Sequence, residues 1–183
     1  MTDLKLIERI GKAFAHRPMP AEVVKMDGRF QIDSDIEDAL WFAGRGWRDL
    51  NAENWRCHYS GLSYFSPEAF AYYVQSLLIL TIQNPKHYPD LAVDSLVWEL
   101  DSSPGIENLS PLATRRYYGF SDEEFEAIKE WLLWASENVS DVFSGAAVSG
   151  PGDGFGRAFD SIHLLQKVSK SHGINEREDS DAR

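Results

Sequence analysis

The feature that most constrains the fold is a helix start at Ser66, followed by an apolar stripe that ends at a proline. Ser66 is a favoured N-cap, Pro67 suits the first helical position, and Glu68 complements the positive end of the helix dipole. Asn84-Pro85 ends the pattern. Between them, apolar residues recur at helical spacing and cover much of the circumference: Phe70, Tyr73, Val74, Leu77, Leu78, Leu80 and Ile82. The sequence therefore predicts a central helix here.

Other segments carry similar signals. Ser34 with Glu37, and Ser121 with Glu124, have the spacing of a capping box. Together with apolar periodicity, these signals predict helices over 3–16, 35–43, 49–55, 90–100, 121–137 and 157–171, and a short helical turn over 110–119. Alternation around Phe30 also admits one short β element near residues 25–32. The expected fold is mainly α, a single-domain bundle of about five to seven helices.

Composition divides the chain into four parts. Residues 1–143 form the expected helical core domain, and residues 144–156 contain five glycines and one proline, which is typical of a loop. The C-terminal helix is expected over 157–171. Residues 172–183 are polar and charged with a single Ile174, so we expect a disordered tail.

Two local expectations concern burial. The single cysteine, Cys57, excludes an intramolecular disulfide and a multi-thiolate zinc site, and we expect its thiol to be buried. Tyr72 and Tyr73 are adjacent on the central helix, so we expect one of them to lie nearer the surface.

Neither a signal peptide nor a membrane span is evident. Charged residues interrupt the N-terminus up to Lys12, so the apolar core of a signal peptide is missing. The longest apolar run, Val74 to Ile82, is far shorter than the roughly 20 residues of a membrane span. We therefore expect a cytoplasmic protein without membrane contact.

The net charge of −11 is concentrated in the middle of the chain. Residues 31–114 carry four basic and twelve acidic side chains, and no Lys or Arg occurs between Pro89 and Thr114. Such a field repels phosphate backbones, which excludes nucleic acid, and it attracts basic proteins. The alternative is that acidity serves only to keep the protein soluble.

No motif for catalysis, metal binding or cofactor binding stands out. The glycines of 150–156 lack the Gly-Lys-Ser/Thr of a phosphate-binding loop, and no serine lies in a Gly-x-Ser-x-Gly elbow. The five histidines are not paired at metal-ligand spacing. The aromatic residues from Tyr59 to Tyr73 lack interleaved Lys or Arg for nucleic-acid contact. We therefore assign no catalytic residue, no metal ligand and no cofactor.

One stretch resembles a known family. The run Leu62-Ser63-Tyr64-Phe65-Ser66-Pro67-Glu68-Ala69-Phe70-Ala71-Tyr72-Tyr73, preceded by Trp47 and followed by Phe120-Ser121-Asp122-Glu123-Glu124, resembles an uncharacterised family of small bacterial proteins. Its members share a Phe-Ser-Pro-Glu-Ala-Phe-x-Tyr-Tyr helix start. The resemblance covers residues 36–138 and implies a bacterial origin and a helical fold, but no activity.

Two functional hypotheses follow. The first is a protein-binding module that neutralises a basic partner, such as an immunity protein that inhibits a toxin or nuclease. The contact surface would consist of two acidic clusters at helix starts: Asp33, Asp35, Glu37 and Asp38, and Asp122, Glu123, Glu124 and Glu126. Capping alone also explains carboxylates at these positions. The second hypothesis is a small-molecule-binding protein or enzyme with an interhelical pocket. The sequence leaves the oligomeric state open.

Overall fold

The computed structural model describes residues 2–24, 34–100, 111–139 and 153–181. These residues form eight α-helices and two short 3-10 helices, and no strand occurs among them, so the mainly α prediction is confirmed. The proposed β element near residues 25–32 lies outside the described residues. The helices are α1 (Asp3–Ala13), α2 (Ser34–Trp41), η1 (Trp47–Asp49), α3 (Ala52–Cys57), η2 (Tyr59–Tyr64), α4 (Pro67–Gln83), α5 (Asp90–Leu100), α6 (Pro111–Tyr117), α7 (Asp122–Asn138) and α8 (Asp153–Asp181).

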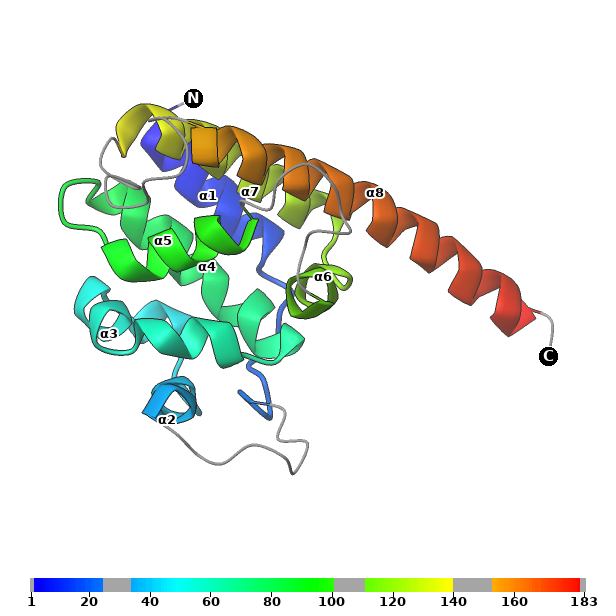
Figure 1. The fold of residues 1–183 in the computed structure, drawn as a ribbon, viewed down its shortest axis with the longest axis horizontal. Helices are drawn as coiled ribbons and strands as arrows, with labels where there is room; N and C mark the ends of the chain where they lie inside the picture. Colours follow the sequence, from blue (N-terminus) through cyan, green and yellow to red (C-terminus); the bar gives the residue numbers. More distant parts are fainter. Residues whose placement is uncertain (1, 25–33, 101–110, 140–152, 182–183) are drawn as a thin grey trace.

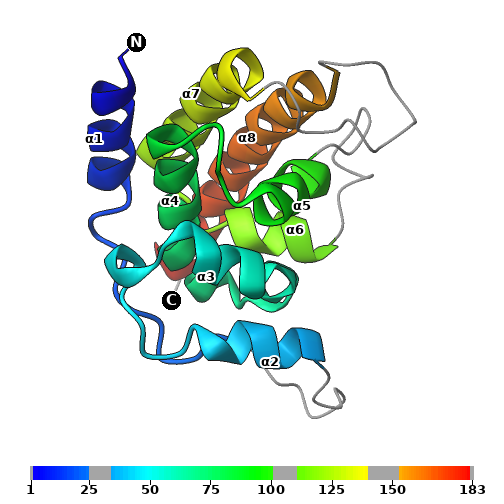
Figure 2. The same ribbon diagram turned by 90° about the vertical axis from the view of Figure 1, so that its left-hand side faces the viewer.

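Helix α4 is the centre of the fold, as its sequence predicted. Ser66 caps it, because its hydroxyl accepts a hydrogen bond from the Ala69 N–H at 3.1 Å. Thirteen of its 17 residues are buried. Figure 2 shows α4 between α1 on one side and α5 on the other, with α7 above and α3 below. A helix that is enclosed in this way buries almost its whole circumference, which its apolar sequence permits.

The enclosure of α4 also buries both adjacent tyrosines. Tyr72 is 8% exposed and Tyr73 is fully buried, so Tyr72 is the one nearer the surface, as expected, although both side chains are buried. The Tyr73 hydroxyl donates to the carbonyl of Phe42 at 2.6 Å. That hydrogen bond offsets the desolvation cost of burying the phenol hydroxyl. Burial raises the pKa of Tyr73 to about 12.

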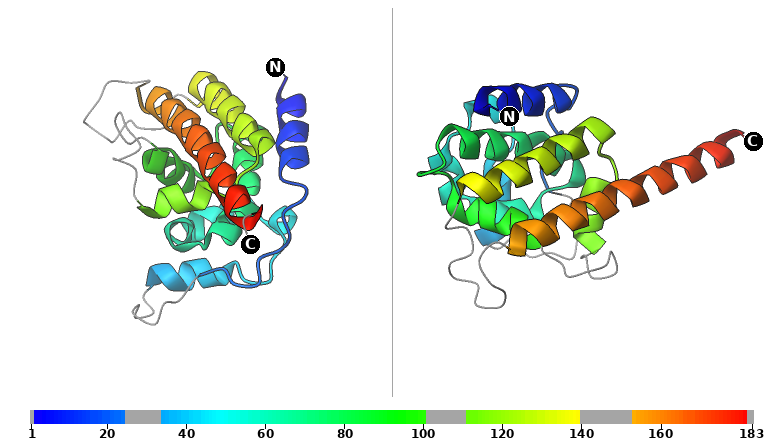
Figure 3. Two further views of the ribbon diagram at one scale, coloured as in Figure 1. Left: turned by 90° about the vertical axis from the view of Figure 1, so that its right-hand side faces the viewer. Right: turned by 90° about the horizontal axis from the view of Figure 1, so that it is seen from above.

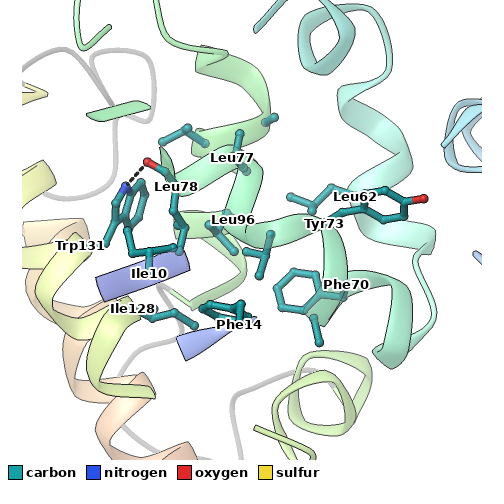
Figure 4. Close-up of a cluster of buried hydrophobic side chains, with 14 of the residues drawn as sticks. Ile10, Phe14, Leu62, Phe70, Tyr73, Leu77, Leu78, Leu96, Ile128 and Trp131 are labelled. Carbon is teal, nitrogen blue, oxygen red and sulfur yellow. Dashed lines mark hydrogen bonds between the residues drawn. The ribbon is translucent and has the colours of Figure 1, made fainter. Parts of the chain in front are cut away.

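The core joins α1, α4 and α7 in one layer of large side chains (Figure 4). In Figure 4, Ile10 lies beside Leu78 of α4, and Phe14 lies beside Ile128 of α7; all four are buried. Trp131 of α7 is buried beside them, and its indole N–H donates to the Leu78 carbonyl at 3.2 Å. Burial of such aromatic and aliphatic side chains supplies the main stabilisation of the fold.

The short helices before α4 differ from the prediction of one helix over 49–55. The chain forms η1 and then α3, because Asn51 caps α3 in a reciprocal box with Asn54. The helix consequently begins and ends later than its apolar pattern suggested. Cys57, at the end of α3, is exposed, so the expected burial of its thiol is wrong.

Helix α8 is longer than predicted at both ends. It begins at Asp153, inside the expected glycine-rich loop 144–156, of which residues 144–152 lie outside the described residues. It also continues through residues 172–181, where a disordered tail was expected. Its first part lies alongside α7, whereas its C-terminal part extends beyond the other helices (Figures 1 and 3). Polar helix formers such as Glu and Arg can continue a helix that packing has started, which apolar periodicity does not detect.

Candidate functional site

The first turn of α7 holds one of the two predicted acidic clusters. Ser121 and Glu124 form the predicted capping box: the Ser121 N–H donates to Glu124 Oε2 at 2.7 Å, and the Glu124 N–H donates to the Ser121 hydroxyl at 3.3 Å. The cluster therefore has a local structural role before any partner is considered.

Glu124 is fully buried, so its assignment to a partner surface is wrong. Its two carboxylate oxygens accept two hydrogen bonds of 2.6 Å from the guanidinium of Arg17. Arg17 also donates to the Gly119 carbonyl and lies over the Phe120 ring at 5.3 Å. This bidentate ion pair joins the segment after α1 to the start of α7. The two partners are far apart in sequence, so no local pattern revealed the pair.

Asp122 and Glu126 contact lysine and glutamine side chains of α7 and α8. Gln166 of α8 donates to Asp122 at 2.7 Å, and the Lys170 ammonium lies 2.9 Å from the same carboxylate. Lys129 contacts Glu126 at 2.9 Å and also donates to Gln166. The hydrogen bonds from Lys170 and Gln166 lower the pKa of Asp122, and the hydrogen bond from Lys129 lowers that of Glu126. These carboxylates join α7 to α8. Glu123, the fourth predicted residue of this cluster, is exposed and makes no such link among the described contacts.

The second predicted cluster is only partly at the surface. Asp33 lies outside the described residues, Asp35 is partly buried, and Glu37 is exposed. Asp38 accepts a hydrogen bond from the Ser60 hydroxyl at 2.6 Å. The cluster lies on α2, which is at the opposite end of the molecule from α7 in Figures 1 and 2. The two clusters therefore do not form one patch.

Asp38 also contacts His58, which belongs to an aromatic stack beside α2. The Asp38 carboxylate is 2.9 Å from His58 Nδ1, and the imidazole stacks on Trp41 with a centroid separation of 4.3 Å. Gly61 allows η2 to approach α2 closely, since a Cβ there would lie 2.7 Å from the Ala39 nitrogen. We interpret Asp38 as a residue that joins α2 to η2.

A half-open groove lies between α1 and the start of α7. Its volume is about 690 Å³, and its lining combines basic residues of α1 with acidic residues of α7: Arg9, Lys12, Ala13, His16, Ser121, Asp122, Glu123 and Glu126. Arg9 pairs with Glu130 at 2.8 Å at its margin. Opposite charges on facing walls suit a small polar ligand that carries both signs of charge.

Helix α5 presents a different surface on the other side of α4 (Figure 2). Trp98 is 74% exposed and Leu91 is 48% exposed, although the rest of α5 packs inward through Ala92, Val93, Leu96, Val97 and Leu100. Burial raises the pKa of Asp94 to about 6, and the neighbouring Asp90 carboxylate adds to this rise. The sequence indicated that this region lacks Lys and Arg, but it gave no sign that Trp98 is exposed.

One acidic residue of α5 is taken into the interior. Glu99 accepts a hydrogen bond of 2.6 Å from Arg116 of α6, which is 1% exposed and lies over the Phe70 ring at 5.2 Å. Burial raises the pKa of Glu99, and the Arg116 charge opposes that rise. This pair holds α5 against α6 and leaves Asp90 and Asp94 as the other carboxylates of the helix.

The described residues contain neither a metal-binding cluster nor a membrane-spanning helix. No group of three or more His, Cys, Asp or Glu side chains is arranged to hold a metal ion in that part of the chain. No described helix combines the length and apolar character that crossing a membrane requires. The resemblance to small bacterial proteins stays a prediction, because no protein-family model, no curated protein and no solved structure matches the chain.

Proposed function

We propose that the protein is a cytoplasmic binding module that neutralises a basic partner protein, most concretely an immunity protein that inhibits a nuclease or another cationic toxin. The observation that carries this proposal is the placement of the arginines in the acidic middle of the chain. They lie against aromatic rings and backbone carbonyls. The exposed carboxylates among the described part of residues 31–114 are Glu37, Asp49, Glu53, Glu68 and Asp90.

Three contacts illustrate this placement. The Arg45 guanidinium lies 4.0 Å from the Trp41 ring centroid and donates to the carbonyl of the same residue. Arg48 lies 4.2 Å from the Trp47 ring centroid. Arg56 donates to the Tyr88 carbonyl at 3.1 Å, although it also contacts an exposed glutamate of its own helix. Cation–π and carbonyl contacts hold Arg45 and Arg48 without a carboxylate partner among the described contacts, whereas Arg56 is shared between carbonyls and Glu53.

A surplus of carboxylates accelerates the capture of a cationic protein. The long-range field steers the partner during diffusion, and the effect weakens as salt screens it. A nuclease binds phosphate backbones through a basic surface. An acidic protein that covers such a surface would block access of the nucleic acid, which is the inhibition that we propose.

The test is capture of a basic protein from the native host, followed by kinetics. A toxin-like protein encoded directly upstream is the first partner to assay, and a pull-down at low salt is the second source. The association rate, measured by stopped-flow, should fall steeply as ionic strength rises. Reversal of exposed Glu37 to Lys should slow association, whereas the matched reversal Glu8→Lys on α1 should have less effect, since it lies in the basic N-terminal part. Recovery of no basic protein at low salt would contradict the proposal.

The groove between α1 and α7 favours a second candidate function, the binding of a small molecule. Its volume of about 690 Å³ lies within the usual range of ligand pockets. A thermal-shift screen with amino acids and other zwitterions is the measurement. Stabilisation that disappears in the double variant Lys12→Ala with Glu123→Ala would support this candidate, and a screen without any stabilising compound would count against it.

A further inference from the structure

We infer that the exposed stripe of α5, formed by Leu91, Ser95 and Trp98, is the docking surface for an amphipathic basic helix of the partner protein. The inference rests on the proposed function and goes beyond it, because it names the surface and the chemistry of the segment that binds there. It also moves the contact away from the acidic helix starts, whose carboxylates are largely engaged within the protein itself.

Helical geometry places these three residues in one row. They are separated by four and three positions, so they lie on the same side of the helix over two turns, about 10 Å from first to last. Leu91 and Trp98 are exposed, and the Ser95 hydroxyl is satisfied by the Leu91 carbonyl at 2.8 Å. The row is therefore an apolar surface interrupted only by a small hydroxyl that already has its partner.

Among the described residues, no hydrogen bond or ring contact explains the position of Trp98. Its side chain is 74% exposed, whereas Trp55 and Trp131 are fully buried in the core. Exposed tryptophans are uncommon on surfaces and are enriched among the residues that dominate the binding energy of interfaces. Exposure of a tryptophan beside a leucine on the same row indicates a surface that is covered by a partner.

Carboxylates lie along one edge of this row. Asp90 is exposed at the helix start, where capping explains its presence, but Asp94 lies in the middle of the helix. The Asp94 Oδ1 atom is buried, and no donor in the described part of the chain bonds to it. Because that atom is buried, a partner cation would act on the Asp94 charge through its electric field from the exposed edge at Asp90, and it would oppose the rise in pKa that burial causes. The edge therefore selects a basic side chain next to the apolar contact.

These features favour a basic helix over a second copy of this chain. Two copies joined through α5 would bring the Asp90 and Asp94 carboxylates of both into one interface, where like charges repel, and each chain has a net charge of −11. A partner helix with a leucine stripe and lysines or arginines along one edge would meet both parts of the surface. Its apolar residues would lie between Leu91 and Trp98, and a basic residue would approach Asp94.

The experiment uses the full-length protein and a designed peptide. The peptide has about 18 residues, long enough to form a helix on binding, with leucines in one stripe and lysines along one edge. A matched peptide carries glutamates in place of the lysines. The indole N–H signals of the 15N-labelled protein are recorded by NMR during titration, and the signal that disappears in Trp98→Ala is thereby assigned. The dissociation constant is measured in parallel by calorimetry.

We expect the lysine peptide to shift the Trp98 indole signal and leave that of buried Trp131 in place, with no effect of the glutamate peptide. Trp98→Ala should weaken binding by about tenfold or more. The matched control is Leu4→Ala, which removes an apolar side chain of equal exposure, 73%, from α1 and should change affinity by less than about twofold. Both substitutions are at exposed positions, and circular dichroism verifies that the variants fold.

The remaining outcomes overturn the inference, and they separate it from the proposed function. Binding that Trp98→Ala and Leu4→Ala weaken equally would show that the peptide docks elsewhere on the acidic surface, so the inference would fail while the proposed function stands. Absence of peptide binding would also end the inference. The proposed function fails independently, through the absence of a basic partner from the host. Self-association that Trp98→Ala abolishes, seen by sedimentation, would assign the surface to a second copy instead.

Discussion

The first turn of α7 and helix α5 both carry acidic residues, but these residues have different surroundings in the fold. At α7, Glu124 is buried against Arg17 and Asp122 is bound by Lys170 and Gln166. At α5, Asp94 is close to exposed Trp98, and one of its carboxylate oxygens has no donor in the described part of the chain. The α7 cluster has the higher density of acidic residues in sequence, yet three of its four carboxylates, those of Asp122, Glu124 and Glu126, pair with cations of the protein itself.

The difference teaches that acidic density along a chain does not measure the charge that is available to a partner. A carboxylate at a helix start is favoured by the dipole and by capping, so such clusters recur without any external role. A carboxylate in the middle of a helix, beside an uncovered tryptophan, has no such local explanation. Substitutions in the two regions should therefore differ in their effects on stability.

The largest effect is expected at Glu124. Glu124→Gln removes the charge that compensates Arg17 in a buried site, and loss of one partner of a buried ion pair leaves the other uncompensated. We expect the free energy of unfolding in urea to fall by about 3 kcal/mol. Glu123→Gln, at the exposed neighbouring position, is the control and should change it by less than about 0.5 kcal/mol. Equal effects of the two variants would show that Glu124 is accessible after all.

The next effect concerns the link between α7 and α8. Lys129→Met removes the ammonium that contacts Glu126 and Gln166, and the amide oxygen of Gln166 is then left without that donor. We expect a loss of about 1 to 3 kcal/mol in the free energy of unfolding. The control is Lys167→Met at an exposed position of α8. A neutral Lys129→Met would indicate that the network does not stabilise the helix pair.

A smaller effect, which depends on pH, is expected at Asp94. The pKa of Asp94 is raised from 3.8 to about 6 in the folded protein, so the folded state binds more protons than the unfolded state between these values. The Asp94 contribution to stability therefore falls as pH rises from 4 to 6 and is constant above that. Because the side chain is only half-buried, we discount the cost at pH 7 to about 1 kcal/mol.

Asp94→Asn tests this dependence. We expect the variant to gain stability relative to the native sequence at pH 7 and to show little gain at pH 4, where the folded carboxyl group is protonated and pH lies close to the unfolded pKa of 3.8. Thermal unfolding at a series of pH values is the measurement. A difference between the two proteins that is the same at every pH would refute the assignment of a destabilising charge at Asp94.

The smallest effect is expected at Trp98. Trp98→Ala removes a side chain that is already mostly in water, so the free energy of unfolding should change by less than about 0.5 kcal/mol. Trp131→Ala, which empties a buried site, should cost about 3 to 5 kcal/mol. A large loss of stability at Trp98 would show that the tryptophan contributes to the fold, and the contrast with α7 would disappear.

Most helices were predictable because their signals are local. The cap at Ser66 and the capping box at Ser121 lie within one turn of the residues that they bond, and the stripes of α4 and α7 repeat at helical spacing. Prediction failed where a short polar cap shifted a helix, as at Asn51, or where polar residues continued one, as in α8. In both cases the apolar pattern carried no information about the boundary.

The candidate site was less predictable, for a related reason. The sequence correctly marked the middle of the chain as acidic, but it assigned the contact surface to the densest clusters. Arg17 reaches Glu124 across 107 positions, and Gln166 reaches Asp122 across 44. Neither contact leaves a periodic trace in the sequence.

The sequence by itself determined that this protein is helical, that α4 is its centre and that its middle region is acidic, because capping, periodicity and net charge depend on residues that are close together in the chain. Only the tertiary structure decided which carboxylates pair with cations of the protein itself. It also decided that Trp98 is the most exposed of the six tryptophans. Burial and pairing depend on neighbours from distant segments, and those neighbours are chosen by packing around α4.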